Sequence, residues 1–236
     1  MSMRVLGIIP ARGGSKGIPR KNIIHVAGKP LIQYSIDEAL KSAQLTHCII
    51  STDDDEIAQV ARACGGEVPF KRPLHLATDQ AQSYDVVIHA LEFMEARHKM
   101  EYNAVVLLQP TTPLRKSEDI DQAISLLESS QADSVVTLCD VGAMHPSRMY
   151  YLAGDPGVYK LQALLPEGSS MTPRQELKKV YIRSGDIYAT SRTSLFKNKS
   201  LIGKDARAIE IPIERSINID SWNDMYLFER YVSLHG

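Results

Sequence analysis

The sequence has little cysteine, no excess of basic charge and no long apolar run. Its three cysteines, Cys48, Cys64 and Cys139, are scattered, odd in number and form no CxxC pair. This pattern argues against a disulfide framework and favours free thiols in a reducing compartment. Lys and Arg number 27 against 28 Asp and Glu, for a formal net charge of −1. Nonspecific nucleic-acid binding is therefore not expected as the main function.

The apolar runs are also too short for a membrane. None approaches the roughly 20 residues of a transmembrane helix, and the stretch MSMRVLGIIPARGG has too short an apolar core for a signal peptide. Repeats, low-complexity segments and linker-like stretches are missing as well. We therefore expect a cytoplasmic protein without membrane partners. A chain of 236 residues suffices for one large α/β domain with a small appendage.

What the sequence does contain is a regular alternation of apolar and amphipathic segments over its first 140 residues. Strands are predicted at 5–10, 47–51, 67–70, 104–109 and 134–141, and helices at 31–42, from 52, at 83–98 and at 117–129. Strands that alternate with helices indicate a doubly wound, mostly parallel sheet of the α/β class.

The alternation stops near Asp140. The stretch MYYLAGDPGVYKLQAL has two strand-like runs around DPG, which is a hairpin signal, and GSSMTPRQELKKVYIRSG is polar and irregular. The pattern resumes with a strand at DIYATS, a helix or turn at 193–196, a strand at AIEIPI and a last helix at 223–234. We predict one domain, 1–236, with an insertion at about 140–184. A hairpin rich in Tyr and Leu buries little on its own, so a partner subunit is expected to cover it.

The segment ARGGSKGIPRKN, at 11–22, directly follows the first predicted strand. Ligands of open parallel sheets bind beyond the carboxyl ends of the strands. Here the glycines allow backbone N–H groups to turn toward an anion, and four side chains supply cations: Arg12, Lys16, Arg20 and Lys21. The spacing matches neither the Walker A loop nor GxGxxG. We interpret the segment as a triphosphate site; the alternative is a Gly-rich surface turn with solvated basic side chains.

The stretch IPARGGSKGIPRKN resembles the opening motif of the acylneuraminate cytidylyltransferases, whereas the related KDO cytidylyltransferases carry a different version. The resemblance continues, in order, through KRP at Lys71–Pro73, LATDQAQSYDVVIHAL from Leu76, LLQPTTPLR at Leu107–Arg115, PRQEL at Pro173–Leu177, SGDIYATS from Ser184 and INID at Ile217–Asp220. It implies a Rossmann-like nucleotidyltransferase fold. It also implies a homodimer, in which the insertion is a dimerisation subdomain that reaches over the neighbour's active site.

The same resemblance implies roles for individual residues. Arg12 and Lys21 would contact the nucleotide phosphates and serve catalysis, with Gly13, Ser15, Asn22, Arg72 and Ser83 completing the nucleotide site. The sugar would be bound by Gln109, Arg174, Gln175 and Tyr188, with Arg174 on its carboxylate. Taken without the resemblance, Arg72 is an exposed loop charge and Arg174 a surface salt-bridge partner of Glu176 or Asp186. Thr111 and Thr112 are expected as turn and cap residues.

The implied reaction is transfer of CMP from CTP to the anomeric hydroxyl of a nine-carbon 2-keto sugar acid, with release of pyrophosphate. N-acetylneuraminate, legionaminate and pseudaminate are all open as the acceptor. Such a transfer needs Mg²⁺, with Mn²⁺ as an alternative and the number of ions open. Where the family usually has Asp-x-Asp, this chain has Asn218-Ile219-Asp220. Asp220 is therefore the expected metal ligand and Asn218 a weaker metal or sugar ligand; the alternative for Asp220 is a helix N-cap, a role that Ser221 fits equally.

Other functions stay open at this point. A GTP-using nonulosonate guanylyltransferase is one, and a non-catalytic nucleotide-binding regulator of the same fold is another, because Asn218 departs from the metal motif. A dinucleotide-dependent oxidoreductase is disfavoured by the missing glycine fingerprint. The acidic run Asp53, Asp54 and Asp55 is expected to cap a helix and complement its dipole.

Overall fold

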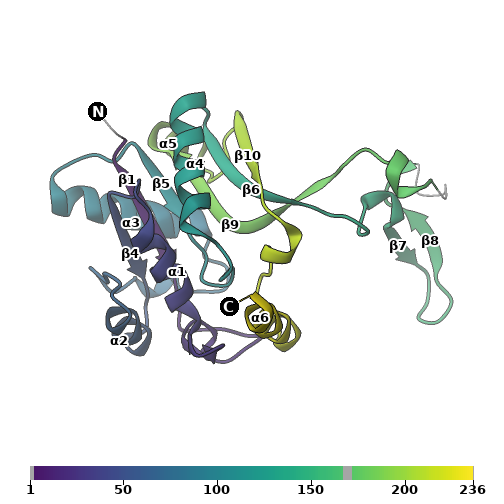
Figure 1. The fold of residues 1–236 in the computed structure, drawn as a ribbon, viewed down its shortest axis with the longest axis horizontal. Coiled ribbons are helices and arrows are strands. Elements are labelled where there is room, and N and C mark those ends of the chain that lie inside the picture. Colours follow the sequence, from purple (N-terminus) through teal and green to yellow (C-terminus); the bar gives the residue numbers. More distant parts are fainter. Residues whose placement is uncertain (1–2, 167–171, 236) are drawn as a thin grey trace.

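The computed structural model describes residues 3–166 and 172–235, in which a central sheet carries helices on both faces and a hairpin projects from one side (Figure 1). The sheet has six strands in the order β10 (Ala206–Glu210), β6 (Ser134–Asp140), β9 (Tyr181–Ser191), β5 (Ala104–Leu107), β1 (Val5–Pro10) and β4 (His47–Ser51). Only β9 runs antiparallel to its neighbours, β5 and β6. The predicted α/β fold with a mostly parallel sheet is confirmed.

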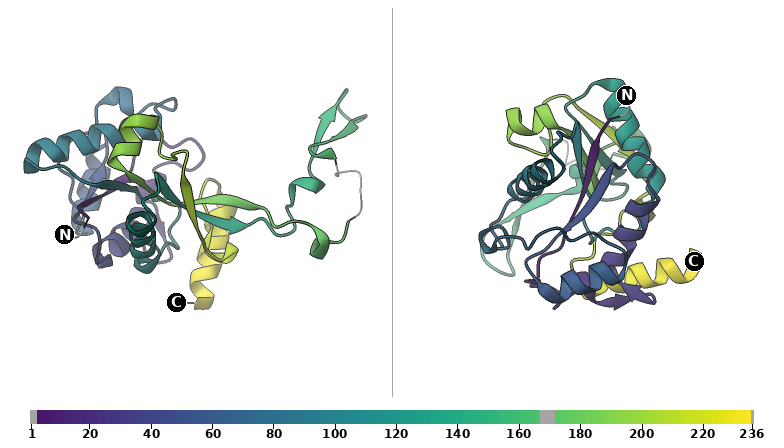
Figure 2. Two further views of the ribbon diagram at one scale, coloured as in Figure 1. Left: turned by 90° about the horizontal axis from the view of Figure 1, so that it is seen from above. Right: turned by 90° about the vertical axis from the view of Figure 1, so that its left-hand side faces the viewer.

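The helices form two layers around this sheet (Figure 2). One face is covered by α1 (Leu31–Lys41), α2 (Asp55–Ala63) and α4 (Ser117–Ser130), and the other by α3 (Ser83–His98) and α5 (Arg192–Asn198). Successive strand side chains point to opposite faces, so Val5 and Ile9 of β1 join the first core whereas Leu6 and Ile8 join the second. The sequence reads as continuously apolar there because both faces are buried.

The C-terminal helix α6 (Trp222–His235) belongs to a third, smaller core. Its Met225 and Phe228 pack with Ile18 of the opening segment and with Leu31 at the start of α1. This packing places the turn that precedes α6 beside the segment that follows β1. Two parts of the chain about 200 residues apart in sequence thus become neighbours, as the ion pair between Lys21 and Asp220 also shows.

Two sequence predictions differ from the structure. The strand expected at 67–70 is only a pair of isolated bridges, Ile49 to Glu67 and Thr52 to Lys71; Pro69 lies between them and has no amide hydrogen for a regular ladder. The strand expected at DIYATS is the second half of the longer β9. A short hairpin of β2 (His25–Val26) and β3 (Lys29–Pro30) was not predicted.

The projecting hairpin is built on an extension of β6 and β9. Leu138, Cys139 and Asp140 pair with the first residues of β9 beyond a bulge, and the ribbon leads to β7 (Tyr150–Ala153) and β8 (Lys160–Ala163). The hairpin predicted around DPG is confirmed, and both figures show it well apart from the helices (Figures 1 and 2). Its exposed side chains include Tyr151, Leu152, Val158, Tyr159 and Leu161. Residues 168–171 of the polar stretch GSSM lie outside the described residues.

Candidate active site

A cavity of about 520 Å³ opens beyond the carboxyl ends of β1 and β5. This is where an open α/β sheet binds its ligands. Several residues predicted for the site line this cavity: Arg12, Ser15, Lys21, Asn22, Arg72, Ser83, Gln109 and Asp220. Lys16, Asp79 and Thr111 line it too. The cavity therefore unites residues from the first quarter, the middle and the end of the chain.

Cations of the opening segment reach the cavity, and each is held by a carboxylate. Arg12 Nη1 lies 2.8 Å from Asp79 Oδ1, and Lys16 Nζ lies 2.6 Å from Asp79 Oδ2. Lys21 Nζ donates to Asp220 Oδ1 at 2.7 Å and to the carbonyl of Ile219 at 2.8 Å. Both carboxylates are well exposed, and exposed ion pairs are weak. A polyanion can therefore take their place at little cost.

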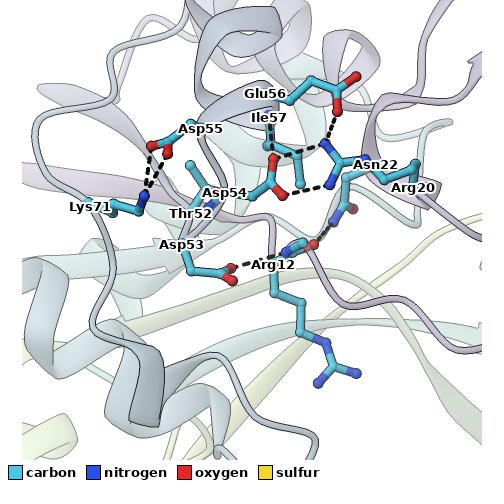
Figure 3. Close-up of polar contacts among 11 residues, drawn as sticks. Arg12, Arg20, Asn22, Thr52, Asp53, Asp54, Asp55, Glu56, Ile57 and Lys71 are labelled. Atoms are coloured by element: carbon cyan, nitrogen blue, oxygen red, sulfur yellow. Dashed lines mark hydrogen bonds and ion pairs between the residues drawn. The ribbon is translucent and has the colours of Figure 1, made fainter.

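The expectation that Arg20 binds phosphate is wrong. Its guanidinium donates to both oxygens of Asp54, at 2.6 and 2.9 Å, and also to Glu56 (Figure 3). Two carboxylates from the start of α2 thus neutralise it outside the cavity. The Arg20 hydrogen bond is the main reason why the pKa of Asp54 falls to about 2. In Figure 3 the side chain of Arg12 points away from this cluster.

The acidic run around Asp54 has the structural role that the sequence predicts. Asp54 is the N-cap of α2 and accepts from the backbone N–H of Ile57 at 2.9 Å. Asp55 pairs with Lys71 at 2.7 Å (Figure 3). Asp53 accepts from the backbone N–H of Gly13 at 3.0 Å. This last contact turns the Gly13 amide toward Asp53, so the structure does not aim it at the cavity as the nucleotide-binding role requires.

Glycines let the opening segment approach its neighbours closely. A Cβ built on Gly13 would lie 2.7 Å from Asp54 Oδ2, and one on Gly17 would lie 2.4 Å from the carbonyl oxygen of Asp220. A larger residue at Gly17 would force one backbone to move, and one at Gly13 would displace the Asp54 side chain. Asn22 adds a hydrogen bond from its Nδ2 to the carbonyl of Arg12, at 2.9 Å. The lack of side chains at the two glycines and the hydrogen bond from the buried Asn22 amide therefore determine the path of the segment.

Arg72 is buried, with 4% of its surface exposed, so the reading as an exposed loop charge is wrong. Its Nε donates to Ser51 Oγ at 3.0 Å, and its Nη2 donates to the Ser51 carbonyl at the end of β4. Burial is the largest effect on the pKa of Arg72 and lowers it to about 10. All of these partners are neutral. The cavity wall thus contains a firmly oriented guanidinium with no direct carboxylate partner, although the charge of Asp53 partly offsets the effect of burial on its pKa.

Gln109 follows β5, and its backbone is held by Arg115, a residue to which sequence reasoning gave no role. Buried Arg115 donates to the carbonyl of Gln109 at 2.7 Å and to Thr112 Oγ1 at 2.8 Å. Thr112 also donates from its N–H and hydroxyl to the Gln109 carbonyl, which confirms its turn role. Arg115 stands within the LLQPTTPLR motif, but a single Arg after a turn carries no signal of burial.

The turn before α6 is attached to the sheet by Thr111, whose carbonyl accepts from the N–H of Ile219 at 2.7 Å. Ser221 caps α6: its hydroxyl accepts from the N–H of Asp224 at 3.3 Å, and its own N–H donates to Asp224 Oδ2 at 2.8 Å. The capping alternative therefore falls to Ser221. The carboxylate of Asp220 remains at the cavity.

The donors around Asp220 suit a magnesium ion. Asn218 Nδ2 donates to Asp220 Oδ2 at 2.8 Å, so the side-chain amide lies against the carboxylate through its nitrogen. Mg²⁺ takes oxygen ligands and typically only one or two protein carboxylates, with phosphates and water completing its shell. Within residues 3–166 and 172–235, no group of three or more His, Cys, Asp or Glu side chains is placed to hold a metal. A metal here would share its shell with a bound phosphate.

A second cavity, of about 260 Å³, adjoins the first, because Ser83 and Gln109 line both. Ser83 begins α3, whose N-terminal end carries partial positive charge. Tyr188 of β9 lines the second cavity and pairs with Leu107 of β5, and burial raises its pKa. The predicted sugar-side residues Gln109 and Tyr188 are therefore brought together.

The backbone of Arg174 and Gln175 belongs to the projecting segment, and Gln175 lines neither of these two cavities. They lie in a short 3-10 helix, Arg174–Glu176, on the projecting segment. Gln175 lines a separate cavity of about 380 Å³ together with Asp140 and His145. A role for these two residues at the active site thus requires a second copy of the chain.

As for membranes, none of the described helices has both the length and the apolar character needed to cross one.

Comparison with known proteins supports this arrangement. The family model described as "Cytidylyltransferase" matches residues 6–213. The chain is 33% identical over 224 residues to the pseudaminic acid cytidylyltransferase of Campylobacter jejuni, covering 94% of each protein. It is 33% identical over 242 residues to the CMP-N,N'-diacetyllegionaminic acid synthase of Legionella pneumophila, covering 99% of this chain and 98% of the relative. An N-acylneuraminate cytidylyltransferase of Streptococcus agalactiae is also 33% identical over 94% of this chain, which spans 52% of that longer protein.

The solved structure of CMP:2-keto-3-deoxy-manno-octonic acid synthetase complexed with CTP has the same fold. It aligns with a TM-score of 0.73 over 99% of this chain and 100% of its own, at 18% identity. The family model spans most of the chain, and two of the curated relatives match over nearly their full length. The chain belongs to the cytidylyltransferase family, in agreement with the resemblance in its motifs.

Proposed function

We propose that this protein transfers CMP from CTP to the anomeric hydroxyl of a nine-carbon 2-keto sugar acid and releases pyrophosphate. The observation that carries the proposal is the cavity beyond β1 and β5, which is lined by Arg12, Lys21, Arg72 and Asp220. Three relatives similar to this chain over 94% or more of its length are named for pseudaminic, legionaminic and N-acylneuraminic acids. The geometry and these names point to the same reaction.

The phosphates of CTP would replace the carboxylates that hold the loop cations. Arg12 and Lys16 would leave Asp79, and Lys21 would leave Asp220, for the more highly charged triphosphate. Guanidinium and ammonium groups neutralise charge that builds on the phosphates as the bond to pyrophosphate breaks. The buried Arg72 is already oriented by Ser51 and would meet the base without reorganisation.

The sugar hydroxyl would attack the α-phosphorus from the second cavity. Its oxygen forms the new P–O bond, the bond to the bridging oxygen of pyrophosphate breaks, and the hydroxyl proton leaves to solvent. Gln109 and Ser83 line both cavities and would align the two substrates. Alignment and charge neutralisation suffice for most of the rate enhancement in such transfers.

We propose Mg²⁺, or Mn²⁺ in its place, as the metal. Asp220 would hold it, and Asn218 would become a second ligand by turning its amide so that the oxygen faces the ion in place of Nδ2. When bound, the ion neutralises phosphate charge and polarises the reacting phosphoryl group. Lys21, which donates to Asp220 in the structure, would then bind the phosphates next to the ion.

We further propose a homodimer in which the segment at about 140–184 covers the neighbour's active site. Support comes from the exposed Tyr151, Leu152 and Leu161 of the hairpin and from the position of Arg174 and Gln175 away from their own cavity. A cytoplasmic location is proposed from the cysteines, since Cys48, Cys64 and Cys139 are free.

The test is a matrix of pyrophosphate release with four nucleoside triphosphates against N-acetylneuraminate, legionaminate and pseudaminate. Release with CTP and one or more of the sugars is expected. A preference for GTP would reassign the enzyme as a guanylyltransferase. Tight CTP binding in calorimetry without release for any pair would support the non-catalytic regulator instead.

A further inference from the structure

The second cavity is lined by two positively charged side chains that have no role so far in the proposed reaction. Arg183 of β9 and Lys199, which follows α5, both line it. They come from different elements, so the fold itself brings the two cations to one space. The other lining residues are polar or apolar: Gln82, Ser83, Tyr84, Leu107, Gln109, Tyr188, Ser200, Leu201 and Ile202. None of the carboxylates in residues 3–166 and 172–235 lines this cavity.

This arrangement contrasts with the nucleotide cavity, where Arg12, Lys16 and Lys21 are each paired with Asp79 or Asp220. Among the ion pairs formed by the described residues, none involves Arg183 or Lys199. The charge of Arg183 also acts on the hydroxyl of Tyr188, lowering its pKa against the larger effect of burial. The Arg183 guanidinium thus lies close to the Tyr188 side of the cavity. Arg183 and Lys199 are both exposed, so an anionic ligand can reach the two cations without displacing a carboxylate from them.

The other residues that line the cavity indicate which further chemical groups such an anionic ligand would carry. Gln109, Ser200 and Tyr188 offer hydrogen-bond donors and acceptors for hydroxyl groups, and Leu201 and Ile202 offer an apolar surface for an acyl methyl group. The shared residues Ser83 and Gln109 place the ligand next to the nucleotide. An acidic, hydroxylated and acylated molecule meets all of these conditions.

We propose that Arg183 and Lys199 bind the carboxylate of the sugar acid, so that the carboxylate site is completed within one chain. The guanidinium of Arg183 would hold it with two parallel hydrogen bonds, and Lys199 would add a point charge. Arg174 of a second copy is then not required for carboxylate recognition. The inference rests on the proposed function, because it takes a sugar acid as the second substrate.

The test compares Arg183→Ala, Arg183→Lys and Lys199→Ala with Lys197→Ala, an exposed lysine on α5 that does not line the cavity. Steady-state kinetics with CTP and the preferred sugar acid are expected to show a KM for the sugar raised about tenfold or more in Arg183→Ala. The KM for CTP should stay within about twofold, Arg183→Lys should retain part of the affinity, and Lys197→Ala should match the wild type.

A second arm measures binding by calorimetry, with the sugar acid and its methyl ester. The wild type should bind the ester about tenfold or more weakly than the acid, whereas Arg183→Ala should bind both alike. Equal discrimination in both proteins, or a loss of discrimination only in Arg174→Ala, would overturn the inference. A wild type that binds the acid through Arg183 but releases no pyrophosphate would refute the proposed function alone. Absence of binding for all three sugar acids would refute both.

Discussion

Individual side chains around the cavity differ in function although they look alike in sequence. Arg12, Arg20 and Lys21 lie within ten residues of one another, yet Arg20 is bound to Asp54 and Glu56 outside the cavity. Arg12 and Lys21 line the cavity, where each is paired with an exposed carboxylate. The local charge partner therefore decides which cation is free to bind phosphate.

At this scale, Arg12→Ala and Lys21→Ala should each raise the KM for CTP and lower kcat. Loss of one charged phosphate contact should cost about 2 to 4 kcal/mol of transition-state stabilisation. Steady-state kinetics with varied CTP measure both constants. Arg20→Ala is the matched control: it should lower the thermal unfolding temperature and leave the KM for CTP nearly unchanged. Normal kinetics for both cavity variants would remove the phosphate site from this segment.

The second residue-scale prediction concerns Asp220, the carboxylate nearest to both Lys21 and Asn218. Asp220→Ala and the isosteric Asp220→Asn should both lose activity while circular dichroism shows an unchanged fold. Asn218→Asp adds a second carboxylate and should lower the Mg²⁺ concentration at half-maximal rate. A raised KM for the sugar in Asn218→Asp, with unchanged Mg²⁺ dependence, would instead assign Asn218 to sugar binding.

At the scale of elements, the site depends on close contacts between segments remote in sequence. The opening segment passes the turn before α6 at Gly17, and the turn after β5 is tied to β9 and α1 by Arg115, which donates to the Asp186 carbonyl at 2.7 Å and to Ser35 Oγ at 3.0 Å. Packing between elements, and not the elements themselves, brings the cavity residues into register.

Gly17→Ala should separate the opening segment from the turn before α6. Its Cβ would lie 2.4 Å from the Asp220 carbonyl oxygen, which forces one backbone to move. We expect a raised KM for CTP and a lower unfolding temperature. Gly14→Ala is the control, because a Cβ there meets nothing within 4 Å. Equal effects of the two substitutions in kinetics and thermal melts would show that the close approach is unimportant.

Asp186 gives the contact between β9 and Arg115 a pH dependence. It is 1% exposed, and burial raises its pKa to about 6 against the opposing effects of the Arg115 charge and the nearby Ser184 hydroxyl. Asp119 and Arg215 also face it from α4 and from the turn before α6. A raised pKa means that the folded state retains the proton longer than the unfolded chain, so stability falls as pH rises from about 4 to about 6.

The loss of unfolding free energy in this window should be on the order of 3 kcal/mol for wild type, given a shift from 3.8 to about 6. Asp186→Asn should remove it. Urea unfolding at pH 4.5 and 7.5 gives the unfolding free energy of both proteins at each pH, and the change between the two pH values is then compared. A variant whose stability changes with pH as steeply as that of the wild type would show that Asp186 is ionised throughout the window.

At the scale of the whole molecule, one chain has an exposed apolar hairpin and two predicted sugar-binding residues far from its own cavity. A dimer would explain both. We expect sedimentation to show a dimer at assay concentrations, and Tyr151→Lys combined with Leu161→Lys to yield monomers because lysines cannot be buried at a subunit interface without cost. A stable, fully active wild-type monomer would contradict this, and Lys197→Ala serves as a surface control.

The sequence by itself determined most of the fold, because the periodicity of buried side chains depends on local geometry. Both faces of β1 are covered, so VLGIIP is apolar throughout, and the helix predicted at 83–98 is observed at Ser83–His98. The motif resemblance placed Arg12, Lys21 and Gln109 at a site, and the structure gathers them in one cavity. The strand predicted at 67–70 is not a regular strand, but the segment does lie along the sheet edge, where it forms two isolated bridges.

Only the tertiary structure decided which polar residues are buried, paired or free. Arg72 and Arg115 are buried while Arg20 is neutralised by α2. No local pattern distinguishes them, because each has a partner remote in sequence: Ser51 for Arg72, Asp186 for Arg115 and Asp54 for Arg20. The unpaired charges of Arg183 and Lys199 likewise emerge only where β9 and the end of α5 meet. Burial and pairing are properties of long-range packing, in which the strength of a charge depends on its distance from water and from other charges. For that reason the composition of the site was readable from the sequence, and its electrostatics were not.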